Sequence, residues 1–131
     1  MGVRVNQAGG QTVAVGTTGR AQRRPVRVLI VDDHEMFSDS VRLALGQEDG
    51  IEVAGTASTL VAARAAVATL RPDVVLLDHR LPDGRGVDSI SELSALNPDS
   101  KIVVLTAAAD DSLLVAATEA GCAGLLLKTS P

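Results

Sequence analysis

Five short apolar runs, separated by segments of helical periodicity, constrain the fold of this chain more than any other feature. The runs are mostly continuous rather than alternating in polarity, which is typical of parallel strands buried on both faces of a sheet. They comprise residues 26–31, 51–56, 74–77, 102–105 and 124–127. Each segment between them is long enough for the crossover helix that two neighbouring parallel strands require.

The segments between the runs carry helix signals. Apolar side chains recur at helical spacing within residues 35–47, 59–70, 87–96 and 112–120. We expect Ser58 to cap the second helix, Asp110 or Asp111 to cap the fourth, and Gly121 to end it. This order of elements predicts an α/β fold with a doubly wound, parallel, five-stranded sheet in the order 2-1-3-4-5.

Length and charge predict one acidic domain behind a basic tail. Residues 1–24 contain four arginines, no acidic residue and no regular apolar spacing, so we expect a disordered tail followed by a domain over residues 25–131. Because the whole chain carries a net charge of −4, the domain itself is acidic. Such a domain is a poor partner for nucleic acid and a good host for a divalent cation. Phe37 is the one aromatic residue, which argues against base stacking.

Cysteine content and hydropathy predict the compartment. Cys122 is the single cysteine, so no disulfide can form within the chain, as is usual in a reducing compartment. No apolar stretch reaches the length of a signal peptide or a membrane helix. We therefore expect a cytoplasmic protein without a membrane partner.

Polar residues stand at the ends of four predicted strands. The first run ends in Asp32 and Asp33, the third in Asp78, the fourth in Thr106 and the fifth in Lys128. In the order 2-1-3-4-5 these strands are neighbours, and their carboxyl ends meet at one edge of the sheet, where doubly wound folds bind ligands. The sequence therefore predicts that the five side chains converge.

Carboxylates that converge predict a magnesium site. Acidic groups in one place repel one another unless a cation neutralises them, and Mg²⁺ prefers oxygen ligands and keeps several waters. We expect Asp33 and Asp78 to bind Mg²⁺ directly and Asp32 to act through water. The main-chain carbonyl of Arg80 is the expected further ligand.

The same residues suit phosphoryl transfer. A carboxylate beside Mg²⁺ can act as the nucleophile, and Asp78 is the candidate acceptor. Lys128 would supply a fixed positive charge, and the hydroxyl of Thr106 would donate a hydrogen bond to a phosphoryl oxygen.

Several of these stretches resemble the receiver domains of response regulators in two-component signalling. The matching stretches are VLIVDDHEMF, VVLLDHRLPDGRG, VVLTA and GLLLK, and the resemblance covers residues 26–131. DDHEMF and LDHRLPDG are similar to regulators of the LuxR/NarL type. The resemblance implies the flavodoxin-like fold and a sensor histidine kinase as phosphoryl donor. It also implies Asp78 as phosphoacceptor, Asp32 and Asp33 as the acidic pair, Thr106 as switch hydroxyl and Lys128 as phosphate-binding lysine.

Two departures from the family pattern bear on function. Leu125 stands where the family usually has an aromatic residue, which leaves open a pseudo-receiver that binds partners without phosphoryl transfer. The fifth helix and the DNA-binding domain of the family are missing from the sequence, so we expect a piece of a longer regulator. One face of the sheet would then be uncovered, and we expect self-association, as a homodimer, through that face or through the surface of the fourth helix and fifth strand.

We expect a signalling domain and not an enzyme beyond self-phosphorylation and self-dephosphorylation. An aspartate-nucleophile phosphatase is the enzymatic alternative, but that class has Asp-x-Asp after the first strand, and here His34 follows Asp32 and Asp33. We expect His34 to start the first helix and not to bind a metal, since no second histidine or cysteine lies at ligand spacing.

Overall fold

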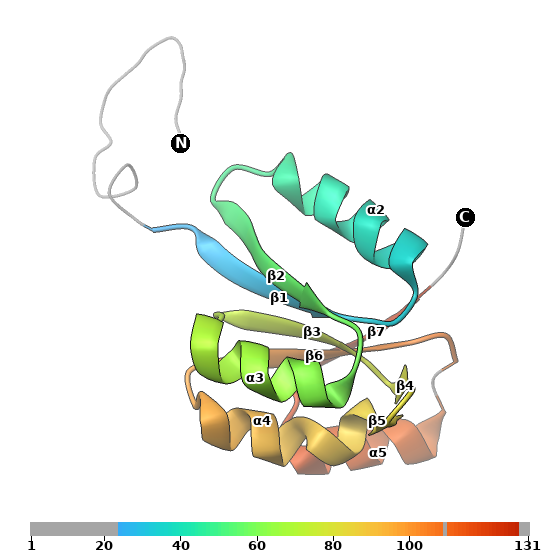
Figure 1. The fold of residues 1–131 in the computed structure, drawn as a ribbon. Coiled ribbons are helices and arrows are strands. Elements are labelled where there is room, and N and C mark those ends of the chain that lie inside the picture. Colours follow the sequence, from blue (N-terminus) through green and yellow to red (C-terminus); the bar gives the residue numbers. More distant parts are fainter. Residues whose placement is uncertain (1–23, 109, 129–131) are drawn as a thin grey trace, which may run out of the picture.

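The strands form one parallel sheet with five members. The computed structural model describes residues 24–108 and 110–128. Its main sheet has the order β2-β1-β3-β6-β7 (Figure 1), and every neighbouring pair is parallel. The members are β1 (Val26–Val31), β2 (Ile51–Ala57), β3 (Val74–Asp78), β6 (Lys101–Thr106) and β7 (Gly124–Leu127). Numbered by these five strands alone, the order is 2-1-3-4-5, as the sequence predicts.

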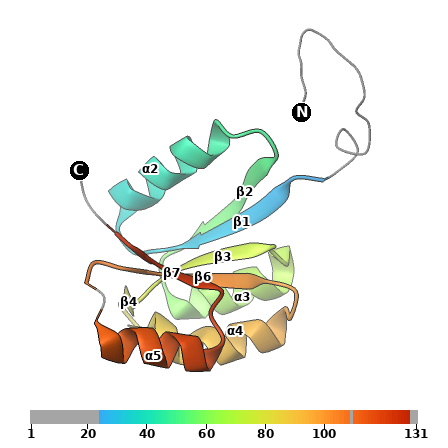
Figure 2. The same ribbon diagram turned by 180° about the vertical axis from the view of Figure 1, so that it is seen from behind.

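The helices divide unequally between the two sides of the sheet. Helix α2 (Glu35–Gly46) lies on one side, and α3 (Leu60–Leu70), α4 (Ile90–Leu96) and α5 (Asp111–Ala120) lie together on the other (Figures 1 and 2). Alternate strand residues therefore meet very different surroundings. The side with three helices holds the buried core, which includes Leu29, Val31, Val75, Leu77, Ile102 and Val104.

The α2 side of the sheet is closed only at its centre. Val28, Ile30 and Leu105 are buried there, but Leu126, which pairs in register with Leu105 on β7, is 55% exposed. The inward apolar residues of α2, such as Phe37, are only half-buried. Among the described elements, α2 alone covers this side, and it leaves the β7 edge open to solvent.

The start of α3 differs from the sequence prediction. Thr59, not Ser58, is the N-cap, because its hydroxyl accepts a hydrogen bond from the amide of Ala62 at 3.0 Å. The amides of Leu60 and Val61 instead donate to the carboxylate of Asp83, at 2.8 and 3.0 Å. A residue far along the chain thus satisfies the first free amides of the helix, which allows the helix to begin one residue later. Asp110 and Gly121 cap α5 as predicted.

The segment after β3 is more irregular than the single helix expected over residues 87–96. It forms a small hairpin of β4 (Arg80–Leu81) and β5 (Gly84–Arg85), then a 3₁₀ turn η1 (Gly86–Ser89), and only then α4. Gly86 explains the tight path, because a Cβ there would clash with the main-chain oxygen of Asp78. The chain therefore folds back directly over the end of β3.

The predicted tail lies almost wholly outside the described residues. Of residues 1–24 only Arg24 is described, and its guanidinium binds both carboxylate oxygens of Asp73, at 2.8 and 2.7 Å. This pairing lowers the pKa of Asp73, with a further contribution from the amide of Arg27. Within the described residues, no helix is both long enough and apolar enough to cross a bilayer.

Candidate functional site

Asp32 and Asp78 are neighbours because their strands are paired. Val31 of β1 is in register with Leu77 of β3, so the residue that follows each lies at the same edge of the sheet. Both aspartates are buried, with 4% and 3% of their surface exposed. A buried carboxylate pair is costly unless cations or hydrogen-bond donors compensate its negative charge.

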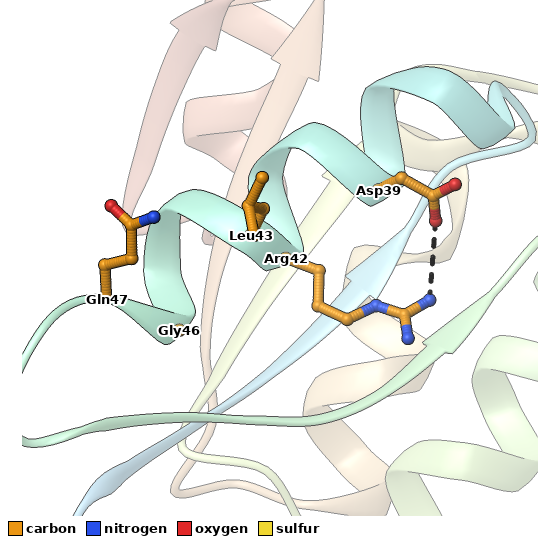
Figure 3. A pocket seen from close by; sticks show the side chains of 5 residues that line it. All are labelled: Asp39, Arg42, Leu43, Gly46 and Gln47. Atoms are coloured by element: carbon orange, nitrogen blue, oxygen red, sulfur yellow. Dashed lines mark ion pairs between the residues drawn. The ribbon is translucent and has the colours of Figure 1, made fainter.

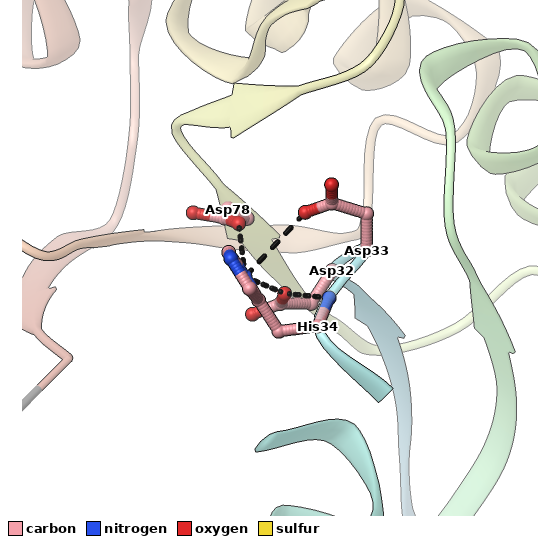
Figure 4. A group of neighbouring side chains, drawn as sticks. All are labelled: Asp32, Asp33, His34 and Asp78. Carbon is pink, nitrogen blue, oxygen red and sulfur yellow. Dashed lines mark hydrogen bonds and ion pairs between the residues drawn. The ribbon is translucent and has the colours of Figure 1, made fainter. Parts of the chain in front are cut away.

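Four side chains form a compact group of potential metal ligands. One ligand atom from each of Asp32, Asp33, His34 and Asp78 lies within 4.8 Å of all the others. Figure 4 shows these side chains turned toward a common centre from the ends of β1 and β3. Three carboxylates carry more negative charge than one lysine can balance, and their oxygens are the ligand type that Mg²⁺ prefers. The donor set therefore fits a divalent cation.

Lys128 reaches this group from the edge strand β7. Its Nζ donates to Asp32 Oδ2 at 2.7 Å and to Asp78 Oδ2 at 3.4 Å. The ammonium also lies 4.4 Å from the ring centroid of Phe37, within cation–π range. The lysine amide donates to the carbonyl of Thr106 at 2.7 Å, which fixes the main chain from which the side chain starts.

The pKa of Asp78 is raised above its ordinary value. Burial of the carboxylate is the largest cause, and the charge of Asp32 adds to it, while Lys128 and the amide of Arg80 act in the opposite direction. The raised pKa means that the negative charge of Asp78 is not fully compensated by the protein groups around it. A cation bound beside Asp78 would supply what is missing.

Thr106 and Arg80 lie next to the acids, and their predicted roles stay predictions. Thr106 is buried at the end of β6, and its hydroxyl exchanges hydrogen bonds with the main chain of Ala108. The amide of Arg80 lies 3.5 Å from Asp78 Oδ1. The structure therefore brings Asp32, Asp33, Asp78 and Lys128 into mutual reach, and it places the other two residues on the strand ends beside them.

His34 is the site residue that the sequence reasoning missed. It is the N-cap of α2, as predicted, but its side chain makes no capping hydrogen bond. Its Nδ1 instead lies 2.9 Å from Asp32 Oδ1, 3.4 Å from Asp33 Oδ1 and 3.1 Å from Lys128 Nζ. The signal was its position directly after two acids at a strand end, where a side chain can turn back toward the sheet.

The other histidine, His79, forms main-chain hydrogen bonds that hold the segments beside the site together. Its amide donates to the carbonyl of Leu105 at 2.8 Å, and its carbonyl accepts from Gly86 at 2.7 Å. Burial lowers the pKa of its imidazole, and Arg85 and Arg80 lower it further. His79 therefore ties β3, β6 and the following turn together.

Two hollows border helix α2. One, of about 410 Å³, adjoins the acids and is lined by Asp32, Asp33, Glu35, Ser38, Asp39, Arg42, Thr56, Ala57 and Ser58. The other, of about 480 Å³, lies farther along the helix and is lined by Asp39, Arg42, Leu43, Gly46 and Gln47 (Figure 3). It contains an ion pair of 3.5 Å between Arg42 and Asp39 and none of the clustered acids. Of these two hollows, the first is the one that the acidic pair Asp32 and Asp33 helps to line.

The chain is similar to response regulators in sequence. Residues 28–131 match the family of response regulator receiver domains. The chain is 37% identical over 103 residues to the DNA-binding transcriptional activator DevR/DosR of Mycobacterium tuberculosis, which covers 79% of this chain and 48% of that protein. It spans about half the length of the first curated relatives that it matches.

Solved structures agree with this similarity. The signal receiver domain of the regulator NarL from Mycobacterium tuberculosis has a TM-score of 0.77 and 30% identity, over 83% of this chain and 88% of that one. A response regulator from Burkholderia pseudomallei with a phosphorylated aspartic acid, a calcium ion and citrate has a TM-score of 0.73 and 27% identity, over 80% and 61%. The sheet order, the acids and lysine at its edge and these matches agree, and the chain belongs to the receiver domain family of two-component response regulators, among relatives of the LuxR/NarL type.

Proposed function

We propose that Asp78 accepts a phosphoryl group from the phosphohistidine of a sensor histidine kinase, with Mg²⁺ bound at the neighbouring acids. The observation that carries the proposal is the position of Lys128 Nζ, 2.7 Å from Asp32 and 3.4 Å from Asp78 at the end of the sheet. A fixed positive charge beside a buried carboxylate and a metal-binding pair is what an aspartyl phosphate requires.

The chemistry assigns one task to each residue. A carboxylate oxygen of Asp78 forms the new bond to phosphorus while the bond from phosphorus to the donor nitrogen breaks, and the released imidazole keeps that electron pair and takes up a proton. Lys128 then shifts from the carboxylates to a phosphoryl oxygen. The hydroxyl of Thr106 rotates away from Ala108 to donate to another phosphoryl oxygen, which is a small movement for a side chain that already lies at the strand end.

Asp33 and Asp78 would hold the metal ion directly, Asp32 through water, and the carbonyl of Arg80 would complete the protein ligands. When bound, Mg²⁺ neutralises charge on the phosphoryl oxygens. Within the chain, the raised pKa of Asp78 supports this assignment, because it reports a carboxylate with too little compensating charge. The calcium ion and phosphorylated aspartate of the Burkholderia regulator support it by similarity.

We propose that the output of the switch belongs to a longer protein. The similarity to a DNA-binding activator supports a regulator in which phosphorylation changes the activity of a DNA-binding region, while this acidic receiver does not itself bind nucleic acid. We infer a signalling role and no turnover of external substrates. We also propose self-association, either through the open sheet face beside α2 or through the surface of α5 and β7.

The test is Mg²⁺-dependent phosphorylation with acetyl phosphate, followed by mass spectrometry of the intact chain. We expect a mass gain of one phosphoryl group that requires Mg²⁺ and is lost in Asp78→Asn. Asp73→Asn is the matched control, since that carboxylate lies outside the site, and it should be phosphorylated like the unmodified chain.

Three outcomes would contradict the proposal. No mass gain in the unmodified chain would favour a pseudo-receiver, an alternative that Leu125 supports because an aliphatic side chain packs against the core where the family has an aromatic ring. A mass gain that survives Asp78→Asn would place the acceptor elsewhere. Steady hydrolysis of a phosphate ester would instead indicate an enzyme.

A further inference from the structure

We propose that the imidazole of His34 is a direct metal ligand, and that it makes this site bind a first-row transition-metal ion such as Zn²⁺ more tightly than an all-oxygen receiver site would. The inference rests on the proposed cation site and goes beyond it, because it adds a nitrogen ligand and predicts a different order of metal affinity. The proposed phosphoryl transfer assigns no task to His34.

The imidazole of His34 lies close enough to the three carboxylates for all four groups to share one metal ion. Its Nδ1 lies 2.9 Å from Asp32 Oδ1, 3.4 Å from Asp33 Oδ1 and 3.7 Å from Asp78 Oδ2. Bonds of about 2.0–2.2 Å from zinc to nitrogen and oxygen place neighbouring ligand atoms about 3.0–3.5 Å apart. Figure 4 shows the ring nitrogen turned toward the same centre as the three carboxylates.

The side chain of His34 is directed toward the acids and not toward the first turn of α2, and its Nδ1 lies within hydrogen-bond distance of Asp32 Oδ1, at 2.9 Å. A side chain at an N-cap ordinarily accepts a hydrogen bond from the first turn, and this one does not. The amide of His34 donates to Asp32 Oδ1 at 2.7 Å, which holds the main chain of the loop while the ring lies over the acids. The ring is 64% exposed, so an ion held there keeps an open side for water or a phosphoryl oxygen.

Three carboxylates carry more negative charge than the one ammonium beside them. Lys128 Nζ lies 3.1 Å from His34 Nδ1, so a metal ion bound by these side chains requires the ammonium to move away from the ring. The two histidines of the chain have different surroundings, because His79 is half-buried beside the site while His34 faces the carboxylates. Imidazole nitrogen is a preferred ligand for zinc and similar ions and a poor one for Mg²⁺, which selects oxygen. His34 therefore changes which ion the site prefers.

Calorimetric titration with Zn²⁺ alone and with Mg²⁺ alone measures the effect. We expect His34→Asn to weaken Zn²⁺ binding by about tenfold or more and Mg²⁺ binding by less than about threefold, because loss of a nitrogen ligand removes affinity only for ions that use it. Asparagine is a favoured N-cap residue, so this variant preserves the start of α2. His79→Asn is the matched control and should leave the Zn²⁺ to Mg²⁺ affinity ratio unchanged.

A spectroscopic readout identifies the bound atom. With ¹⁵N-labelled histidine, Zn²⁺ should shift the Nδ1 resonance of His34 strongly and that of His79 little. An unchanged affinity ratio in His34→Asn, or an unshifted His34 resonance at saturating Zn²⁺, would overturn the inference.

The inference and the proposed function can fail separately. If His34→Asn keeps Mg²⁺-dependent phosphorylation on Asp78 and the same metal preference, the phosphoacceptor assignment stands and the His34 ligand is wrong. If the chain binds Zn²⁺ through His34 but gains no phosphoryl group with Mg²⁺, the ligand is confirmed and the phosphoacceptor assignment is wrong.

Discussion

Lys128 is the residue on which the contacts of the site converge. Its ammonium touches Asp32 and Asp78, lies beside His34 and faces the ring of Phe37, and only 11% of its side chain is exposed. A lysine side chain loses much rotational freedom when it is held in one place. Phe37, in the first turn of α2, compensates part of that loss and directs the ammonium toward the carboxylates.

Phe37 can be tested as a positioning residue for Lys128. We expect Phe37→Leu to slow phosphorylation by acetyl phosphate about two- to thirtyfold, because a cation–π contact contributes about 0.5–2 kcal/mol. Phe37→Tyr keeps the aromatic face and should retain the unmodified rate. Thermal unfolding of both variants separates this effect from loss of packing, and equal rates for the leucine and tyrosine variants would refute the assignment.

The pKa of Asp78 predicts how its charge affects stability. Because the folded-state pKa is raised, the folded chain binds more protons than the unfolded chain between the two pKa values, and stability falls as pH rises through that window. Above it, the ionised carboxylate is destabilising, so Asp78→Asn should raise the melting temperature at pH 7 in metal-free buffer.

Asp73 supplies a control of opposite sign for that experiment. Its folded-state pKa is lowered by Arg24, so its stabilising contribution is present above the unfolded pKa and is lost as pH falls through the folded one. Asp73→Asn should therefore lower the melting temperature at pH 7. Thermal unfolding monitored by circular dichroism at pH 7 and pH 3 measures both variants, and a lower melting temperature for Asp78→Asn would contradict the prediction.

The sequence was sufficient for the acids and the lysine but not for their neighbours. Asp32, Asp33, Asp78 and Lys128 follow apolar strands directly, and the geometry of a parallel sheet brings such positions together. The direction of the His34 ring depends on the extended backbone at the start of α2, with φ −92° and ψ 100°, which no spacing rule specifies. The position of His34 after two acids suggests proximity to the site, but the direction of its ring follows only from the three-dimensional structure.

At the scale of elements, the segment between β3 and α4 determines how closely the chain covers Asp78. Gly86 passes directly over the end of β3, and Asp83 binds the first amides of α3. These two hydrogen bonds lower the pKa of Asp83. The segment between β3 and α4 therefore connects the end of β3, which carries Asp78, to α3, on the side of the sheet that holds the buried core.

A pair of glycine variants tests the close approach at Gly86. A methyl group there would meet the main-chain oxygen of Asp78 and the side chain of Leu77, so we expect Gly86→Ala to cost about 1–3 kcal/mol of unfolding free energy and to slow phosphorylation. At Gly46, the last residue of α2, a methyl group would meet no atom within 4 Å, and Gly46→Ala should be neutral or slightly stabilising. Urea unfolding compares them, and equal stability of the two variants would contradict the prediction.

The regular elements were predictable, whereas the irregular ones were not. Continuous apolar runs identified the five strands of the main sheet to within a residue or so, because burial on both faces leaves little choice of residue type. The hairpin β4–β5, the turn η1 and the shifted cap at Thr59 depend on Asp83 and Gly86, whose partners are distant in sequence or lie in the main chain. The intrinsic helix or strand propensity of a residue does not depend on such contacts and therefore cannot predict them.

At the scale of the whole molecule, the two sides of the sheet differ in how well they are covered. Three helices enclose one side, and α2 alone of the described helices lies on the other (Figures 1 and 2). On that open side, Leu126 is more than half exposed, and Val103 and Leu76 are half-buried. A contiguous apolar surface of this kind favours association with another molecule.

Leu126 tests that surface. We expect the chain to self-associate at high concentration, and Leu126→Ser to weaken the association at least about tenfold, because burial of one leucine side chain is worth about 1.5–3 kcal/mol. Val61→Ser, which replaces a residue 61% exposed on α3 across the sheet, is the matched control. Sedimentation velocity measures the effect, and equal weakening by both variants, or a monomer at every concentration, would contradict the prediction.

The contact between Lys128 and Asp32 spans 96 positions of the chain. A ribosome makes the aspartates well before the lysine, and β7, which presents that lysine, pairs with β6 alone among the described strands. Until residue 128 has been synthesised and has left the ribosome, the acids therefore lack the ammonium group that contacts them in the finished chain. The pocket is completed only once β7 has joined the sheet.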